Sequence, residues 1–255
     1  MRWLYWAGGV LLYFAFLAVT APADILLWAI NRFGPASVVA EGASGTLWQG
    51  EARQISFTPK GGQAVAIGPL SWQIHPLRLL LGELSSGVKL DGSVSGKADL
   101  SLGVQRIVIR QLDLSLPAAW LATLQPGLDL WQPGGTLTLR SQDFALQSGQ
   151  YSGQGEITWE QAVLGISPVR PLGNYQAEIS GAGKAIQFQV QTRSGPLELQ
   201  GNGAWTPLGL EFTGTAWARG REVELRNLLG MMGSLKPDGR YAIRVEGRGQ
   251  RHPER

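Results

Sequence analysis

The sequence predicts a mainly β protein, in which an N-terminal transmembrane helix precedes an antiparallel, curved β-sheet domain with one or two short helices. Two observations support this prediction: an uncharged run near the start of the chain, and repeated alternation of apolar and polar residues after it. The chain has 255 residues, of which 35 are glycine, and only 16% carry a charge. Low charge and alternating runs broken by glycine are typical of β structure with many turns.

The first element is the uncharged run from Trp3 to Ala23, which is 21 residues long. At about 1.5 Å per residue, a helix of this length crosses a hydrocarbon core of about 30 Å. Only Arg2 and the amino group precede the run, so we expect the N-terminus in the cytoplasm and the bulk of the chain in the periplasm. We assign residues 1–33 to the anchor and a short amphipathic surface segment, Leu26 to Phe33, which we expect to lie on the membrane.

A cleavable signal peptide is the alternative interpretation of this run. Ala21, Pro22 and Ala23 place small residues at the two positions that a signal peptidase requires. A proline between those positions disfavours cleavage, and the apolar run is longer than the apolar core of a usual signal peptide. We therefore favour an uncleaved anchor.

Period-two alternation dominates the rest of the chain. From Leu90 to Leu102 every even position is apolar or glycine and every odd position is polar, which predicts a half-buried antiparallel hairpin. Glycine and proline separate such runs at short intervals, as in a meander. The same alternation recurs at Leu112/Leu114/Leu116, Leu137/Leu139, Ile186/Phe188/Val190, Leu210/Phe212 and Tyr241/Ile243/Val245.

Two short helices are expected, over Pro117–Leu124 and Leu225–Met232, and they contribute to a pattern that looks duplicated. GTLWQGEA at 45–52 resembles GEITWEQA at 155–162. We interpret the body as two related β units with a basic tail after them, and chance agreement between β-rich segments is the alternative. The predicted divisions are 40–140, 149–247 and, for the tail, 248–255.

Residues that carry chemistry are scarce. The chain has no cysteine, which excludes thiol catalysis and thiolate zinc sites. Its two histidines are His75 and His252, and no glycine-flanked serine nucleophile or nucleotide-binding glycine motif accompanies them. The carboxylates are spread one per strand or turn, so a periplasmic hydrolase has little support. We predict no enzyme, no cofactor and no metal.

Nucleic-acid binding is also excluded by the distribution of charge. The net charge is +3, and from Arg240 onward five arginines face two glutamates. The basic excess therefore belongs to the tail, and no basic face recurs through the body.

The remaining candidates are bulky apolar residues that would contact a partner or line a groove, although ordinary core packing is the preferred explanation for most of the tryptophans. The candidates are Trp48, Trp72, Leu79, Leu80, Trp159 and Trp205.

Three segments resemble the protein N family of the type II secretion system. SGTLWQGEA at 44–52 and LSWQIHPLRLLLGEL at 70–84 look like two of its Trp-containing stretches, and LLGMMGSLKPDGRYAIRVEG at 228–247 is similar to its closing segment. The Met-Met-Gly-Ser run is a small departure, and the residues beyond Gly247 have no counterpart. The resemblance implies an inner-membrane accessory component of the machine that exports folded proteins across the outer membrane of Gram-negative bacteria, and it implies no catalytic residues.

Two functions therefore remain open. In the first, the periplasmic β domain contacts other secretion subunits, either the inner-membrane platform or the outer-membrane secretin, by strand addition at an open sheet edge. In the second, a sheet with one continuous apolar face binds or transfers lipid, resembling AsmA-type proteins. The strict alternation with few helices to cover the apolar face motivates the second function.

Overall fold

The computed structural model describes Trp3, Trp6, Gly9, Tyr13, Phe16, Leu17 and residues 19–33, 37–58, 64–79, 81–124 and 128–247. The chain forms two compact units, Met1–Val104 and Gln105–Arg255, here called the N-terminal unit and the C-terminal unit. The predicted units 40–140 and 149–247 rest on similar segments rather than on contacts, and they stay a prediction.

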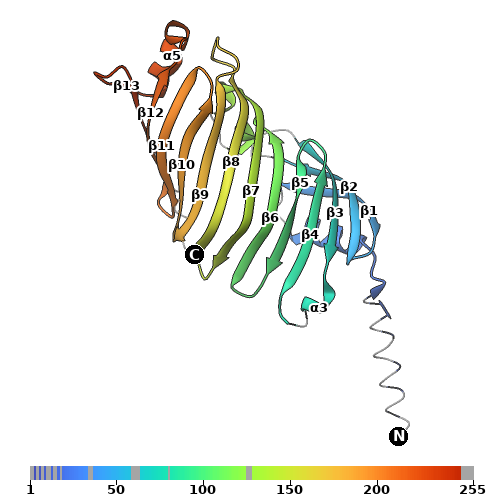
Figure 1. Ribbon diagram of the computed structural model, residues 1–255. Helices are drawn as coiled ribbons and strands as arrows, with labels where there is room; N and C mark the ends of the chain where they lie inside the picture. Colours follow the sequence, from blue (N-terminus) through green and yellow to red (C-terminus); the bar gives the residue numbers. More distant parts are fainter. Residues whose placement is uncertain are drawn as a thin grey trace. The chain divides into compact units, whose positions relative to one another are not determined.

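The N-terminal unit is an antiparallel meander in which each strand pairs with the next one along the chain (Figure 1). Its strands are β1 (Val38–Gly45), β2 (Gln49–Phe57), β3 (Val65–Ile74), β4 (Leu84–Asp91) and β5 (Ser95–Leu102), and its helices are α2 (Asp24–Phe33) and α3 (Pro76–Leu79).

The hairpin predicted from the alternation is formed by β4 and β5. Lys89 lies opposite Lys97 in its register, and residues 92–94 form the turn. Even positions of β5 are half-buried and odd ones exposed as far as Leu100, which confirms the pattern. At the end of the strand the pattern reverses, since Ser101 is buried and Leu102 is exposed.

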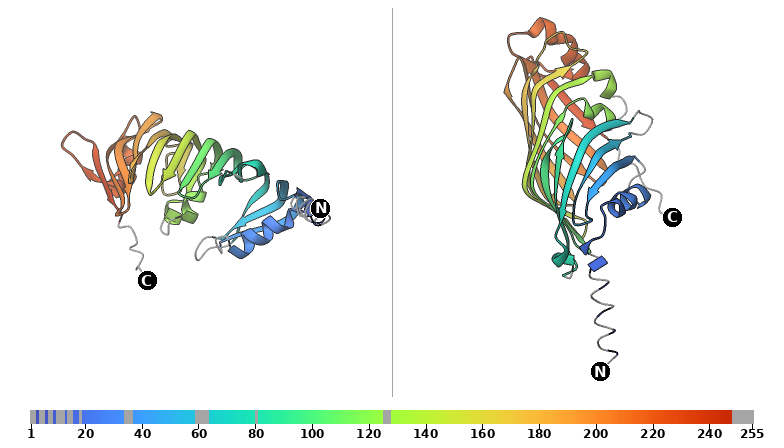
Figure 2. Two further views of the ribbon diagram at one scale, coloured as in Figure 1. Left: turned by 90° about the horizontal axis from the view of Figure 1, so that it is seen from below. Right: turned by 90° about the vertical axis from the view of Figure 1, so that its right-hand side faces the viewer.

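Helix α2 supplies one side of the core of the N-terminal unit. Leu27 is buried together with Ala40, Ala52 and Trp72, and α2 lies along the sheet face in Figure 2. The predicted amphipathic segment is thus helical but begins at Asp24, and its buried side packs on protein. Its other side remains available for the expected membrane contact, which stays a prediction.

The expected transmembrane helix lies largely outside the described residues. Within the ranges given above, no helix combines the length and apolar character needed to span a bilayer.

The C-terminal unit is a second, larger antiparallel meander. Its strands follow the order β6-β7-β8-β9-β10-β11-β12-β14-β13, so only the last two exchange places. The strands are β6 (Arg106–Pro117), β7 (Pro133–Gln147), β8 (Gln150–Leu164), β9 (Gly173–Gly183), β10 (Ala185–Ser194), β11 (Leu197–Thr206), β12 (Gly209–Ala218), β13 (Ser234–Leu235) and β14 (Tyr241–Glu246). The helices are α4 (Trp120–Leu124), η1 (Leu128–Trp131) and α5 (Glu222–Met232).

Both helices expected from the sequence are present as α4 and α5. Helix α5 begins three residues earlier than predicted, at Glu222. Glu222 and Glu224 stand in its first turn, where carboxylates interact favourably with the positive end of the helix dipole. The carboxylate of Glu222 also accepts a 2.8 Å hydrogen bond from the Gly220 N–H.

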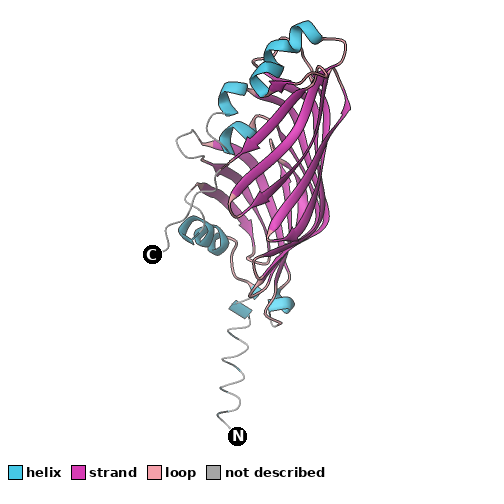
Figure 3. Ribbon diagram, turned by 90° about the vertical axis from the view of Figure 1, so that its left-hand side faces the viewer, coloured by secondary structure: helices cyan, strands magenta, loops and turns pink. Residues whose placement is uncertain are grey.

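The sheet of the C-terminal unit has one apolar and one polar face. Leu225, Leu228 and Leu229 of α5 pack on one face against Leu197, Ala216 and other buried residues. The short helices of this unit lie on one side of its sheet, near one end of the strands (Figure 3). We call this side the apolar face. It carries the alternating residues named above from Leu112 to Val245.

Candidate partner-binding surfaces

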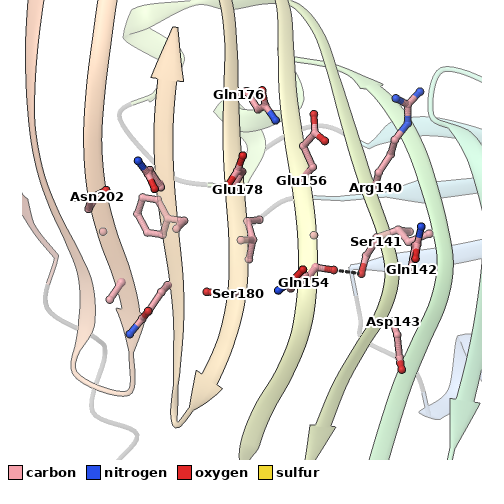
Figure 4. A pocket seen from close by; sticks show the side chains of 18 of the residues that line it. Arg140, Ser141, Gln142, Asp143, Gln154, Glu156, Gln176, Glu178, Ser180 and Asn202 are labelled. Atoms are coloured by element: carbon pink, nitrogen blue, oxygen red, sulfur yellow. Dashed lines mark hydrogen bonds between the residues drawn. The ribbon is translucent and has the colours of Figure 1, made fainter. Parts of the chain in front are cut away.

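The polar face of the C-terminal unit is hollowed along its middle. The hollow has a volume of about 1300 Å³ and extends over strands β6 to β12. Figure 4 shows Arg140, Glu156 and Glu178 on neighbouring strands of this face. The hydroxyl of Ser141, also in the lining, donates a 2.6 Å hydrogen bond to the Gln154 carbonyl.

The register aligns polar side chains into a row across the hollow. Each member lies directly opposite the next: Asp113, Arg140, Glu156, Glu178, Gln189, Asn202, Thr213 and, on β14 beyond the hollow, Arg244. Within this row Glu156 faces Glu178, and like charges in that position destabilise a sheet.

The hollow carries a net negative charge. Five carboxylates line it, from Asp113, Asp143, Glu156, Glu178 and Glu211, against the single cation Arg140. The Arg140 Nε atom lies 3.5 Å from Asp113 Oδ1. In the described part of the chain no salt bridge reaches Glu156 or Glu178. This surface therefore suits a partner that presents basic or amide groups.

Sequence reasoning did not select this hollow. Its residues were noted only as the polar half of each alternating strand, for example Gln187 and Gln189 between Ile186 and Val190. Glutamine and glutamate at every second position also occur on any solvated face. Only the cross-strand register shows that they line up.

Two of the predicted contact tryptophans, Trp48 and Trp72, lie in the N-terminal unit. Trp72 is 5% exposed, and its indole N–H donates a 3.0 Å hydrogen bond to the Leu47 carbonyl. Trp48 follows Leu47 directly and is half-buried, and its carbonyl accepts a hydrogen bond from Ile74. Leu79 is exposed on α3, and Leu80 lies outside the described residues. Among Trp48, Trp72 and Leu79, the side chain of Leu79 is the most exposed, at 42%.

The other two candidates lie apart on the C-terminal unit. Trp159 is half-buried on β8, donates to the Gly134 carbonyl at 2.9 Å and packs beside Tyr175, with 6.1 Å between ring centroids. Trp205 on β11 is 60% exposed. Trp205 is thus accessible to a partner, whereas the Trp159 N–H already has its acceptor.

The outer edge of β1 is covered. The Asn31 side chain on α2 donates to the Ala40 carbonyl and accepts from the Ala40 N–H, each at 3.0 Å. Ala23 also donates to the Gly45 carbonyl at 3.2 Å. These bonds satisfy backbone groups that would otherwise attract a further strand. Strand addition, which the sequence suggested as a binding mode, is thus hindered at this edge.

In the described part of the chain, Tyr175 and Glu222 have pKa values that depart from the ordinary ones. Burial raises the pKa of the Tyr175 phenol far above its ordinary value, and the Glu198 carboxylate raises it further. Hydrogen bonds from the backbone N–H groups of Glu222 and Gly220 lower the pKa of the Glu222 carboxyl. The buried Tyr175 hydroxyl lies within hydrogen-bonding distance of the Leu172 and Leu197 carbonyls, so it stabilises the core and does not face a substrate.

His75, the sole histidine within the described ranges, is exposed at the end of β3. Among those same residues, no group of three or more His, Asp or Glu side chains could hold a metal ion.

Comparison with known proteins identifies the family. The family described as "Type II secretion system (T2SS), protein N" matches residues 36–244. The type II secretion system protein N of Pectobacterium carotovorum subsp. carotovorum is 28% identical over 248 residues, which cover 94% of each chain. The protein of the same name from Vibrio cholerae serotype O1 is 32% identical over 114 residues, 43% of this chain and 42% of that one. No solved structure matches.

Proposed function

Because the chain belongs to the protein N family of the type II secretion system, we propose that it is an inner-membrane accessory component of that system in a Gram-negative bacterium. Residues 3–23 cross the membrane with the N-terminus in the cytoplasm, and both β units lie in the periplasm. There they contact other secretion subunits, of the inner-membrane platform or the outer-membrane secretin, and the protein itself catalyses no reaction. The observation that carries this proposal is the family match, which extends over the strands of both units.

The polar hollow supports a role in holding a protein partner. Its carboxylates and amides offer many hydrogen-bond acceptors and donors on a regular sheet, and its negative charge favours partners with exposed Lys or Arg. A single mobile charge on a strand face contributes little affinity, but a row of them orients the partner.

The outward side of α2 supports attachment to the inner membrane. Trp28 and Phe33 are 61% and 74% exposed, and their rings meet edge to face at 5.6 Å. Arg32 lies 5.7 Å from the Phe33 ring centroid. Aromatic side chains with a nearby cation suit the headgroup region of a bilayer, and α2 starts directly after the uncharged run.

The proposed role can be tested by measuring how much of a folded substrate protein the cells export. We expect deletion of the gene to lower secretion of a folded substrate protein, and the full-length chain to restore it. Normal export in the deletion strain, combined with failure to recover any secretion subunit after crosslinking, would refute the proposal.

Crosslinking maps the partner. A photoreactive amino acid at Glu178 in the hollow, or at the exposed Trp205, should capture a secretion subunit in intact cells. The matched control is Leu208, which is 81% exposed in the β11–β12 turn. Capture from Leu208 equal to that from Glu178 would show that the hollow is not the contact surface.

Topology can be read separately, because the chain has no native cysteine. Single cysteines at Ser93 and Gly9 should react differently with a membrane-impermeant maleimide added to spheroplasts. We expect labelling at Ser93, in the β4–β5 turn, and protection at Gly9. N-terminal sequencing of the mature protein distinguishes the anchor from a cleaved signal peptide.

Lipid binding is the second candidate. The apolar face of the C-terminal unit favours it, since Trp205 and Val245 on this face are 60% and 44% exposed. The hollow on the polar face is lined mainly by polar residues, which favours the first function. Mass spectrometry of the purified full-length protein would decide: a stoichiometric phospholipid that is lost in a Trp205→Glu variant would support the lipid function.

A further inference from the structure

The last strand of the C-terminal unit, β14, has a free edge. The Gly247 N–H donates to the Leu210 carbonyl at 2.7 Å, so the backbone groups of residues 243, 245 and 247 turn toward β12. Those of Arg244 and Glu246 therefore turn outward. Strand β13 pairs only with Tyr241 and Ala242. Within the described ranges no strand other than β12 pairs with Arg244 or Glu246, so the outer side of β14 leaves a template for strand addition there.

The charges along this edge are unbalanced within one chain. Glu246 lies directly opposite Glu211 on β12, and this like-charge pair is unfavourable. The nearest cation is Arg244 on the same strand, with 3.8 Å between its Nε atom and Glu246 Oε1. Both side chains are about three-quarters exposed, at 75% and 73%, so this contact is strongly screened by water. A cation brought next to Glu246 across the free edge would offset the repulsion between Glu246 and Glu211.

We propose that two copies of the chain associate through their β14 edges, antiparallel, about a two-fold axis at Val245. This register places Arg244 opposite Glu246 of the second copy and Glu246 opposite Arg244 of the second copy. Because the backbone groups of both residues point outward, the two pairs would form four N–H to carbonyl hydrogen bonds. Each Glu246 then has an arginine on one side to offset Glu211 on the other.

The sequence of the edge favours a second copy as the occupant. The Arg-Val-Glu run is complementary to itself when reversed about Val245, as an isologous interface requires. An axis at Arg244 or Glu246 would instead oppose two arginines or two glutamates. Val245 is 44% exposed on the apolar face and lies opposite Phe212. In the proposed register it meets Val245 of the second copy, so the two apolar faces become continuous.

A cysteine at the axis tests this arrangement in the full-length protein in its own membranes. Val245 of each copy forms a non-hydrogen-bonded pair, in which Cβ atoms about 4.5–5.5 Å apart approach disulfide geometry. The chain has no other cysteine, so a disulfide must join two molecules. We expect a mild oxidant to convert Val245→Cys to a dimer. Leu208→Cys, in a turn and more exposed than Val245 (81% against 44%), measures random collision.

Charge reversal tests the register. In the Val245→Cys background, Arg244→Glu should lower the crosslinked fraction about ten-fold, because both attractive pairs become repulsive. The double variant Arg244→Glu/Glu246→Arg should restore the crosslinked fraction. Each cross-strand pair then again joins an arginine to a glutamate, with the two positions exchanged.

Three outcomes would overturn the proposal: a yield no higher than that of Leu208→Cys, no response to Arg244→Glu, or no recovery in the double variant. If the cysteine variant accumulates poorly, a photoreactive amino acid at Val245 can detect the same contact between the two β14 edges. A product that contains a different protein would show that the edge serves another partner. Export in the charge variants is measured in parallel, so loss of the dimer can be separated from loss of the secretion role.

Discussion

The Trp72 indole N–H donates to the carbonyl of Leu47, which precedes it by 25 residues, at 3.0 Å. Trp159 makes a similar bond of 2.9 Å to the Gly134 carbonyl, again 25 residues earlier. In the similar segments 45–52 and 155–162, Trp48 is the fourth residue and Trp159 the fifth, and Trp72 lies outside the first segment. The two units thus use a similar indole hydrogen bond, but not at aligned positions.

Replacing the Trp72 indole should separate its packing from its hydrogen bond. Trp72→Phe keeps an aromatic ring but leaves the Leu47 carbonyl without this donor, and we expect a loss of about 1 kcal/mol in unfolding free energy. Trp72→Ala also opens a cavity and should cost about 3–5 kcal/mol. Urea unfolding of the full-length protein followed by circular dichroism measures both. Trp205→Phe, at an exposed site, should change stability by less than about 0.5 kcal/mol.

Removing the Tyr175 hydroxyl should alter the response to alkaline pH. The phenol lies 3.0 Å from the Leu197 carbonyl and 3.3 Å from the Leu172 carbonyl, and burial raises its pKa above the ordinary 10.0. The folded state therefore favours the neutral phenol. The stability that follows is complete below about pH 10 and is lost as the pH rises further.

Tyr175→Phe should thus cost about 1 kcal/mol at pH 7 and show a shallower decline between about pH 10 and 11. Denaturant titrations at several pH values measure this difference. Tyr151→Phe on β8 is the control for removing a tyrosine hydroxyl elsewhere in the same sheet. Parallel curves for Tyr175→Phe and the wild type would contradict the assigned cause.

Two glycines in the β7–β8 hairpin should respond differently to alanine. Both have positive φ, 76° at Gly149 and 111° at Gly153. A Cβ atom on Gly149 meets nothing within 4 Å, whereas one on Gly153 would overlap the Asp143 carbonyl oxygen. Gly149→Ala should therefore cost about 1 kcal/mol and Gly153→Ala more than about 3 kcal/mol. Equal losses in thermal or urea unfolding would show that the hairpin adjusts at Gly153.

Asn31→Ala should open the outer edge of β1. The variant removes both hydrogen bonds to Ala40, so the Ala40 amide should exchange its hydrogen at least about ten-fold faster. Hydrogen exchange with mass spectrometry measures this protection. Asn31→Asp keeps an acceptor for the Ala40 N–H and should give an intermediate result. Unchanged exchange in Asn31→Ala would mean that the helix, and not its amide, covers the edge.

His75→Ala should leave secretion unchanged. The side chain is exposed and belongs to no metal-binding cluster among the described residues. Export of a folded substrate by the complemented deletion strain measures this. A severe loss of export at normal protein levels would reopen the hydrolase interpretation.

The alternation of apolar and polar residues predicted the strands well where the pairing register between neighbouring strands is regular. β5 and β10 follow their period-two patterns closely, and the meander follows from the glycine-rich turns between the strands. The pattern detected only Leu137 and Leu139 of β7, although the strand continues to Gln147. The register shifts between Ser141 and Asp143, and this bulge moves the next apolar side chain from an odd position to Phe144. A fixed period cannot follow such a shift.

The candidate contact residues were less predictable than the fold. Tryptophan occurs both in protein cores and at interfaces. Only the three-dimensional packing therefore distinguishes the buried Trp72 from the exposed Trp205. The acidic row of the hollow depends on strand register, which the sequence of any single strand does not contain.

The nearest-neighbour order of the strands has a consequence for biogenesis. A chain that leaves a translocation channel N-terminus first presents each hairpin when the strand it must pair with has already emerged. We therefore expect the sheet to grow vectorially, one hairpin at a time, without waiting for distant segments. Only β14 must pass over β13 to reach β12, so closure of α5 against this strand would be the final event of folding.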